Sequence, residues 1–174
     1  GAILLASASC TVDVSITPTA AGIFTDTINV VYHNGVQITS TDRDLTVNAV
    51  MPAFIDISDT PLYNYGTVAV GSVNSHSFTL TNTGGVAATL VTGNGLAAPF
   101  LFPGGVYPGA GGTCGFILNV GASCSVVVGY EPSGPGVITD TLNIDYNNGL
   151  GLVTSSRDVQ GNARSEERRV GKEC

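Results

Sequence analysis

The sequence predicts an all-β protein whose complete domain is a two-sheet β-sandwich. Several short segments alternate apolar and polar residues with a period of two, and nowhere does the helical period of 3.6 persist for ten residues. Turn-forming clusters of Gly, Pro, Asn and Ser separate these segments. In addition, residues 10–49 align with residues 124–163 at a constant offset of 114, without a gap.

This repeat divides the chain. An offset of 114 residues is too long for a solenoid repeat and is typical of a whole domain. We therefore interpret residues 1–50 as the C-terminal part of one repeat and residues 51–163 as a complete repeat. Extending the offset backwards matches Gly1 with Gly115. We thus expect the first repeat to lack its front, including the counterpart of Cys114. A genuine N-terminus is the alternative.

Residues 164–174 match neither copy of the repeat. They hold four of the six basic residues of the chain and show no apolar periodicity. The segment resembles translated vector or adaptor sequence, and we predict a tail outside the domain. A natural charged tail is the alternative.

The shared part of the two copies predicts three strands in each. In the first copy, the segments with strand-like alternation are 11–17, 23–32 and 36–48. Their counterparts in the second copy are 124–131, 137–146 and 150–161. Between the last two strands of the first copy, Asn34-Gly35 favours a type I′ hairpin turn, because this pair accepts positive φ angles.

The complete repeat adds strands ahead of the shared part. They are expected within 53–58, 61–85, 86–92, 99–102 and 114–119. In the second of these segments Phe78 and Leu80 face inward, and residues 82–85 turn the chain. Residues 103–113 hold five glycines and two prolines and predict an irregular loop. Seven or eight short strands with regular turns are typical of a β-sandwich.

Several motifs of the complete repeat point to one family. They are YGTVAVG at 65–71, FTLTNTG at 78–84, Cys114, GASCSVVV at 121–128 and YEP at 130–132. In this combination the chain resembles the immunoglobulin-like ASH family, and within it the bacterial "choice-of-anchor" branch. The resemblance implies an immunoglobulin-like fold found in tandem on surface and secreted proteins. It implies a structural or protein-binding role and supplies no catalytic residue.

The composition restricts the partners. Only 11% of the residues are charged, the net charge is −7 and the pI is about 4.4. Up to Ala163 the chain has two basic residues and ten acidic ones, a balance that repels phosphate backbones and excludes nucleic acid as an expected partner. No apolar run approaches about 18 residues, so we expect no transmembrane helix.

Two cysteines predict a disulfide. Cys114 and Cys124 lie on consecutive segments joined by a short loop, and in a hairpin they come within bonding distance. The alternative is a pair of buried, reduced thiols. A disulfide would indicate an oxidising compartment, which is the cell surface, the periplasm or the extracellular space. With the bacterial branch that the resemblance indicates, we expect an extracellular or cell-surface location. Cys10 matches Cys124 but lacks its partner, so we expect a thiol there, and Cys174 lies in the tail.

No residue pattern predicts catalysis. The sequence contains no GxSxG, HExxH or P-loop motif, and neither His33 nor His76 is tied to a nucleophile. We therefore expect no enzyme activity, no cofactor and no metal. Calcium bound by Asp56 and Asp59 near the join between the repeats is the alternative to this expectation.

An arginine recurs in both copies. Arg43 and Arg157 occupy matching positions on a surface that is otherwise almost free of arginine. We interpret them as structural ion pairs with Asp26 and Asp140 on the neighbouring strand of each hairpin. Such a surface pair would contribute less than about 1 kcal/mol and would help to set strand register.

Three functions fit these features. The first is a non-catalytic structural or adhesive repeat of a surface or secreted protein, with neighbouring domains, copies of itself, surface proteins or glycans as partners. The second is a filament subunit whose half-domain is completed by a neighbouring chain. The third is an accessory binding module of a secreted enzyme, for which the sugar-stacking candidates are Tyr63, Tyr65, Phe102 and Tyr107.

Overall fold

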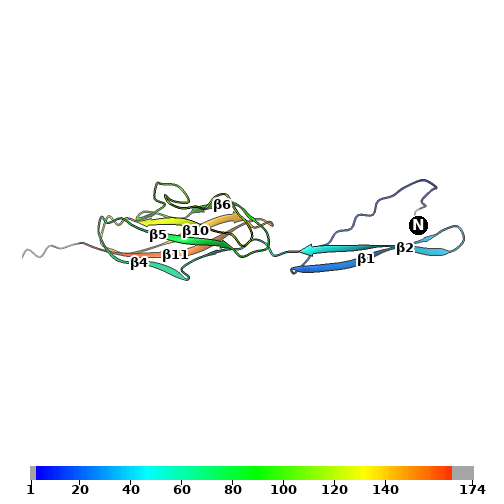
Figure 1. The fold of residues 1–174 in the computed structure, drawn as a ribbon, viewed down its shortest axis with the longest axis horizontal. Coiled ribbons are helices and arrows are strands. Elements are labelled where there is room, and N and C mark those ends of the chain that lie inside the picture. Colours follow the sequence, from blue (N-terminus) through cyan, green and yellow to red (C-terminus); the bar gives the residue numbers. More distant parts are fainter. Residues whose placement is uncertain (1–2, 166–174) are drawn as a thin grey trace, which may run out of the picture. The chain divides into compact units, whose positions relative to one another are not determined.

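The computed structural model describes residues 3–165. The chain divides into two compact units, residues 1–50 and residues 51–174. Within the described range all regular structure is β, with eleven strands and no helix (Figure 1). Accordingly, no helix in this range is long and apolar enough to cross a membrane.

The first unit is built on one antiparallel hairpin. Its strands are β1 (Gly22–His33) and β2 (Ile38–Ala49), paired from Gly22↔Ala49 to His33↔Ile38. The connection is a four-residue loop, 34–37, and the expectation of a type I′ turn is wrong. Only Gly35 has a positive φ, of 96°, whereas type I′ requires two such residues. The Asn34 side chain closes the loop instead, because its Oδ1 accepts the Val36 and Gln37 N–H groups at 2.9 Å.

Residues 11–17 do not form the strand that their alternation predicts. They are exposed and have no ladder partner. Their counterpart in the second unit, β9, is paired on both sides, with β5 and β7. The first unit contains no equivalent of these two neighbours between residues 3 and 50, so the backbone groups of 11–17 have nothing to pair with.

The second unit contains nine strands. They are β3 (Ile55–Ile57), β4 (Leu62–Ala69), β5 (Asn74–Asn82), β6 (Ala88–Asn94), β7 (Phe100–Leu101), β8 (Ile117–Leu118), β9 (Ser123–Tyr130), β10 (Gly136–Asn147) and β11 (Leu152–Arg164). The number of strands is thus higher than the seven or eight expected. The strand expected over 114–119 shrinks to two residues. At the other end β11 includes Arg164, which the sequence places in the tail; residues 166–174 of that tail lie outside the described range.

The nine strands form two sheets with immunoglobulin-like topology. One sheet has the order β4-β11-β10-β6-β8 and the other the order β3-β5-β9-β7. The second order corresponds to the ABED sheet of an immunoglobulin domain, and β6, β10 and β11 correspond to CFG. The first two strands of this unit lie at the edges of different sheets, since β3 pairs with β5 while β4 runs parallel to β11. The prediction of an all-β, immunoglobulin-like sandwich is confirmed.

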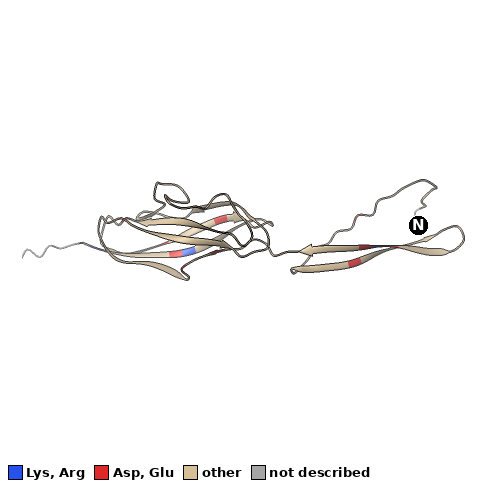
Figure 2. Ribbon diagram, viewed as in Figure 1, with Lys and Arg blue, Asp and Glu red and all other residues tan. Residues whose placement is uncertain are grey.

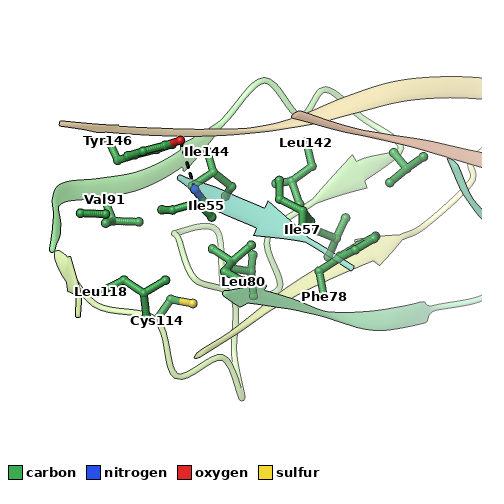
Figure 3. Close-up of a cluster of buried hydrophobic side chains, with 14 of the residues drawn as sticks. Ile55, Ile57, Phe78, Leu80, Val91, Cys114, Leu118, Leu142, Ile144 and Tyr146 are labelled. Atoms are coloured by element: carbon green, nitrogen blue, oxygen red, sulfur yellow. Dashed lines mark hydrogen bonds between the residues drawn. The ribbon is translucent and has the colours of Figure 1, made fainter. Parts of the chain in front are cut away.

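The core of the second unit lies between these sheets (Figure 3). Phe78 and Leu80 of β5 are fully buried, as predicted, and face Leu142 and Ile144 of β10. A hydrogen bond also joins the sheets, because the Ile55 N–H donates to the Tyr146 hydroxyl at 3.1 Å. Strand alternation thus delivers the apolar side chains of both sheets into one interior.

A buried asparagine organises the turn that follows β5. Asn82 is inaccessible to solvent, and its amide donates to the carbonyls of Val86 (2.8 Å) and Leu118 (3.0 Å). Its Oδ1 accepts the N–H groups of Phe54 and Gly84. The side chain therefore ties three separate segments together. Its full set of hydrogen bonds makes the burial of this amide tolerable.

The outer face of each hairpin carries paired polar side chains. Thr27 donates to Asp44 at 2.9 Å in the first unit, and Thr141 donates to Asp158 at the same distance in the second. Neighbouring positions add an Asn29–Asp42 contact. Few strand positions on either unit bear a charge (Figure 2). The outer faces are therefore polar mainly through amides and hydroxyls that hydrogen-bond to one another or to a carboxylate.

Candidate functional site

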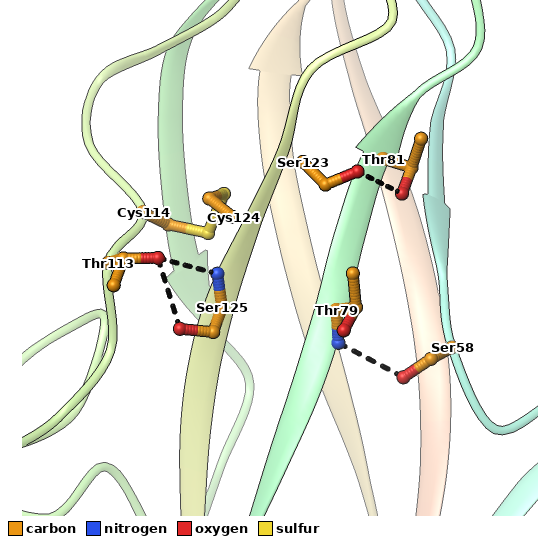
Figure 4. The surroundings of a disulfide bond; sticks show 8 residues. All are labelled: Ser58, Thr79, Thr81, Thr113, Cys114, Ser123, Cys124 and Ser125. Carbon is orange, nitrogen blue, oxygen red and sulfur yellow. Dashed lines mark hydrogen bonds between the residues drawn. A yellow bond between two sulfur atoms is a disulfide. The ribbon is translucent and has the colours of Figure 1, made fainter.

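The predicted disulfide is present in the second unit (Figure 4). Cys114 and Cys124 are bonded, with their Cα atoms 4.9 Å apart. Cys124 belongs to β9, whereas Cys114 lies in the loop before β8. The neighbouring Thr113 hydroxyl accepts the Ser125 N–H at 2.9 Å, so the loop is held to β9 by a hydrogen bond as well. The bond closes the long glycine-rich loop onto the sandwich.

Cys10, the counterpart of Cys124, is exposed and forms no disulfide with any described residue. Cys174 lies outside the described residues. The thiol expected at Cys10 is thus accessible to solvent, one position before the segment that lacks its strand partners.

The expected arginine–aspartate ion pairs do not form. Among residues 3–165, the only contact within 4 Å between a basic side-chain nitrogen and a carboxylate joins the His76 ring to Asp59. Arg157 is buried instead, and its guanidinium donates to the Ile57 carbonyl. Asp140 turns the other way and accepts the Ala97 N–H at 2.7 Å.

The positions of Arg157 and Asp140 in the sheet account for the missing ion pair. Arg157 lies opposite Leu142, and Asp140 lies opposite Val159, so the two are diagonal neighbours. Arg157 sits on β11 and its guanidinium reaches Ile57 of β3 in the facing sheet, whereas Asp140 sits on β10 beside β6 and reaches Ala97 in the segment that follows β6.

In the first unit Arg43 and Asp26 are both exposed, and Asp26 accepts the N–H of Thr27. The pair that does recur is Thr–Asp, at Thr27–Asp44 and Thr141–Asp158. The matching Thr-Asp-Thr and Arg-Asp motifs contained that signal.

His76 forms a cluster with Tyr63, Asp59 and Ser58 that no sequence pattern predicts. Its ring stacks on Tyr63 with a centroid distance of 3.6 Å, and its Nε2 lies 3.0 Å from Asp59 Oδ2. The Ser58 hydroxyl donates a hydrogen bond to this carboxylate, and His76 donates a second one. These two hydrogen bonds, the one from Ser58 most strongly, hold the pKa of Asp59 below its usual range. Ser58 bonds to the carboxylate and not to the imidazole, so the nucleophile–base contact of a catalytic triad is missing here.

Metal and sugar sites gain no support from the geometry. Between residues 3 and 165 no group of three or more His, Cys, Asp or Glu side chains converges, so Asp56 and Asp59 form no calcium cluster. The four ring candidates are packed against the core as partly buried side chains: Tyr63, Tyr65, Phe102 and Tyr107. The Tyr65 hydroxyl donates to the Val128 carbonyl at 2.7 Å, and burial raises the pKa of Tyr107 to about 12.

The most unusual surface of the described chain is the inner face of the first hairpin. Tyr32 is 47% exposed, whereas its counterpart Tyr146 is 2% exposed. Val30 is 42% exposed, whereas its counterpart Ile144 is fully buried. The same side-chain positions that form the core of the second unit therefore face solvent in the first. We call these residues the open face: Phe24, Ile28, Val30, Tyr32, Leu45 and Val47.

A groove forms along the open face. It is lined on one side by Val14 and Ile16 of the segment without strand partners, and on the other by Phe24, Leu45 and Val47. Val14 and Ile16 correspond to the buried Val128 and Tyr130 of β9. The segment thus keeps its apolar side chains towards the hairpin, although it makes no sheet.

Comparison with known proteins gives structural neighbours only. No family model matches the chain, and no curated protein matches it. Among solved structures, the ASH/PapD-like domain 7 of human CEP192 aligns at 16% identity and TM-score 0.49, over 65% of this chain and 87% of that domain. A Porphyromonas gingivalis W83 protein of unknown function aligns at 10% identity and TM-score 0.49, over 84% and 68% of the two chains. The VesB protease of Vibrio cholerae aligns at 20% identity and TM-score 0.47, over 64% of this chain and 32% of that one.

This chain therefore spans about a third of the protease it aligns with. Each TM-score lies below 0.5, so the assignment of the fold rests on the strand order and register of the chain itself.

Proposed function

We propose that this chain is a non-catalytic, immunoglobulin-like repeat of a bacterial surface or secreted protein, which acts as a structural or adhesive spacer. The observation that carries the proposal is the register of the two hairpins. Every pairing of β1 with β2 recurs 114 residues later in β10 and β11, from Gly136↔Ala163 to Asn147↔Leu152. This recurrence supports the proposal, because a spacer can be built from copies of one structural unit.

Two further features support an extracellular setting. The Cys114–Cys124 bond is suited to an oxidising compartment. The chain is poor in charge and rich in Thr, Ser and Asn, a composition that extracellular repeat proteins often have.

The compartment is tested by the stability of the full chain under oxidising and reducing conditions. The disulfide closes a loop with a sequence separation of 10 residues. For a loop of that size the chain-entropy estimate is about 3 kcal/mol. We expect urea unfolding to show a loss of that order when the bond is reduced, while Cys10→Ser, the matched control, has no effect. Equal stability in both states would remove the argument for an oxidising location.

A second function, that of a filament subunit, is favoured by the open face. Unpaired edges and an apolar face are surfaces to which strands of another chain can be added. Light scattering and electron microscopy of the purified full chain distinguish the two functions. Monomers at micromolar concentration support the spacer, whereas fibres that disappear in Leu45→Asp but persist in Ser40→Asp would establish the filament. Leu45 lies on the open face, and Ser40 lies on the opposite face of the same strand, outside the groove.

A further inference from the structure

We infer that the open face is the docking site for the front half of another repeat of this sequence type, carried in the same polypeptide. Such a segment would correspond to residues 53–114, and its final cysteine would bond to Cys10. The inference rests on the proposed function only in treating both units as copies of one repeat. It commits to a single occupant, and the second unit shows what that occupant must provide.

The first requirement is a set of strands with known register. In the second unit β11 takes β4 as a parallel neighbour, with Ala163 opposite Val68, and β10 takes β6, with Asn143 opposite Asn94. The corresponding outer edges of β2 and β1 have no neighbour in the first unit. A front half would fill both edges, at Ala49 of β2 and at Asn29 of β1, because the hairpins share one register.

The second requirement is a partner for residues 10–16. In the second unit Val126 pairs with Phe78, and Val128 pairs with His76, so β5 completes the ladder of β9. The counterparts of Val126 and Val128 are Val12 and Val14, which have no strand partner here. A front half brings the equivalent of β5 to this position. The absence of a strand at 11–17 is then a property of the unoccupied face.

A size exchange indicates that residues 10–16 are built to pack into a closed sandwich. In the second unit the Tyr130 ring fills the space above Gly161, where a Cβ atom would come within 2.3 Å of it. The counterparts in the first unit are Ile16, which is smaller than Tyr130, and Val47, which is larger than Gly161. Both line the groove of the first unit. The exchange replaces one large side chain beside a glycine by two medium-sized side chains, at positions that in the second unit meet between the two sheets.

The source of the segment follows from the continuity of the repeat. Ile3 and Leu4 match Ile117 and Leu118, which form β8. In the second unit β8 pairs with β6, a front strand. Residues 3–9 therefore match the segment that directly follows a front half, and a covalently continuous front half would place its cysteine at the same spacing from Cys10 as Cys114 has from Cys124.

The test is a fusion protein in which residues 51–114 are duplicated directly ahead of Gly1 of the full chain. The readouts are alkylation of Cys10, measured by mass spectrometry, and hydrogen exchange of the amides of 10–16. We expect alkylation of Cys10 to be lost and those amides to become protected, while the original chain shows neither change. Within the fusion, Leu45→Asp is expected to restore alkylation, and its matched control Ser40→Asp is not.

The duplicated segment evolved beside Tyr130 and Gly161, so a second fusion carries Ile16→Tyr and Val47→Gly. The native Cys114–Cys124 bond reports whether the remainder has folded. If that bond forms and Cys10 stays reactive in both fusions, the inference is overturned. Covalent dimers or polymers joined through Cys10 would overturn the commitment to the same polypeptide. A null result in the redox experiment above would remove the surface location but would leave this outcome unaffected.

Discussion

The ring of Tyr130 lies directly against the backbone of Gly161 in the core of the second unit. A Cβ atom built on Gly161 would lie 2.3 Å from two ring atoms of Tyr130, a distance that no packed structure accepts. The ring in turn stacks on Phe100 with a centroid distance of 4.8 Å, so it has little room to move. Glycine is therefore required at 161 for as long as tyrosine occupies 130.

This relationship predicts a rescue. Gly161→Val should destabilise the second unit by about 2 kcal/mol or more, because it overpacks the interior. Tyr130→Ile should cost about 2–3 kcal/mol, because it leaves a cavity. The double variant reproduces the Ile16–Val47 pair of the first copy. Its cost should be smaller than the sum of the two single changes by at least about 1 kcal/mol, measured by urea unfolding. Additive costs would show that the two positions do not exchange volume.

Asn82 provides the second prediction. Its side chain is inaccessible to solvent and forms hydrogen bonds with two backbone carbonyls and two backbone N–H groups. Asn82→Ala should therefore lower the free energy of unfolding by about 3 kcal/mol or more, since unpaired buried polar groups are costly. Thr83→Ala removes a single hydroxyl contact of 3.3 Å and is the matched control, with an expected cost below about 1 kcal/mol. Similar costs for the two variants would contradict the role given to Asn82.

Arg157 and Asp140 should act independently. Arg157 is held by the Ile57 carbonyl, and Asp140 caps the Ala97 N–H, so no direct contact couples them. We expect a double-mutant cycle of Arg157→Met and Asp140→Asn to give a coupling energy within about 0.5 kcal/mol of zero. A coupling above about 1 kcal/mol would restore the ion pair that the sequence predicts. The outcome decides whether the recurring arginine sets strand register or fills the edge of the core.

Asp59 makes the stability depend on pH in the acid range. Hydrogen bonds from Ser58 and His76 lower its pKa in the folded state, so the unfolded state binds more protons between the two pKa values. The stabilisation is present above the ordinary pKa of about 3.9 and is lost as the pH falls through the folded value.

Unfolding of the native chain and of Asp59→Asn, followed from pH 7 to pH 2, should therefore show a difference that shrinks at low pH. The substitution suits the backbone, because residue 59 has a φ of 63° and asparagine accepts this region. Asp56→Asn is the control, and a difference that stays constant with pH would contradict the assignment.

Much of the fold could be predicted from the sequence, for physical reasons that particular elements show. The hairpin 136–164 follows from period-two alternation and from its duplication, because side chains that alternate across a strand must place one set in the core. The disulfide was predictable because Cys114 and Cys124 flank a short loop. The turn between β1 and β2 was predicted at the right place but with the wrong geometry, because the side chain of Asn34 and not its backbone angle closes the loop.

The open face was less predictable. Alternation at Val12, Val14 and Ile16 reports which side is apolar, but a strand also needs a neighbour for its backbone, and that neighbour is not encoded locally. Similarly, the recurrence of Arg157 reveals a constraint without revealing the direction of the side chain. The contact between His76 and Tyr63 joins two strands of different sheets, and no local sequence pattern predicts it.

The hydroxyl and amide pairs on the outer faces bear on the medium in which such a molecule can work. Hydrogen bonds such as Thr141–Asp158 join neighbouring strands at short range, so dissolved ions weaken them far less than they weaken attraction or repulsion between distant charges. With only 11% charged residues, and only two basic ones up to Ala163, the chain has few long-range attractions that salt could screen. Its folding should therefore proceed equally well in fresh water and in brine.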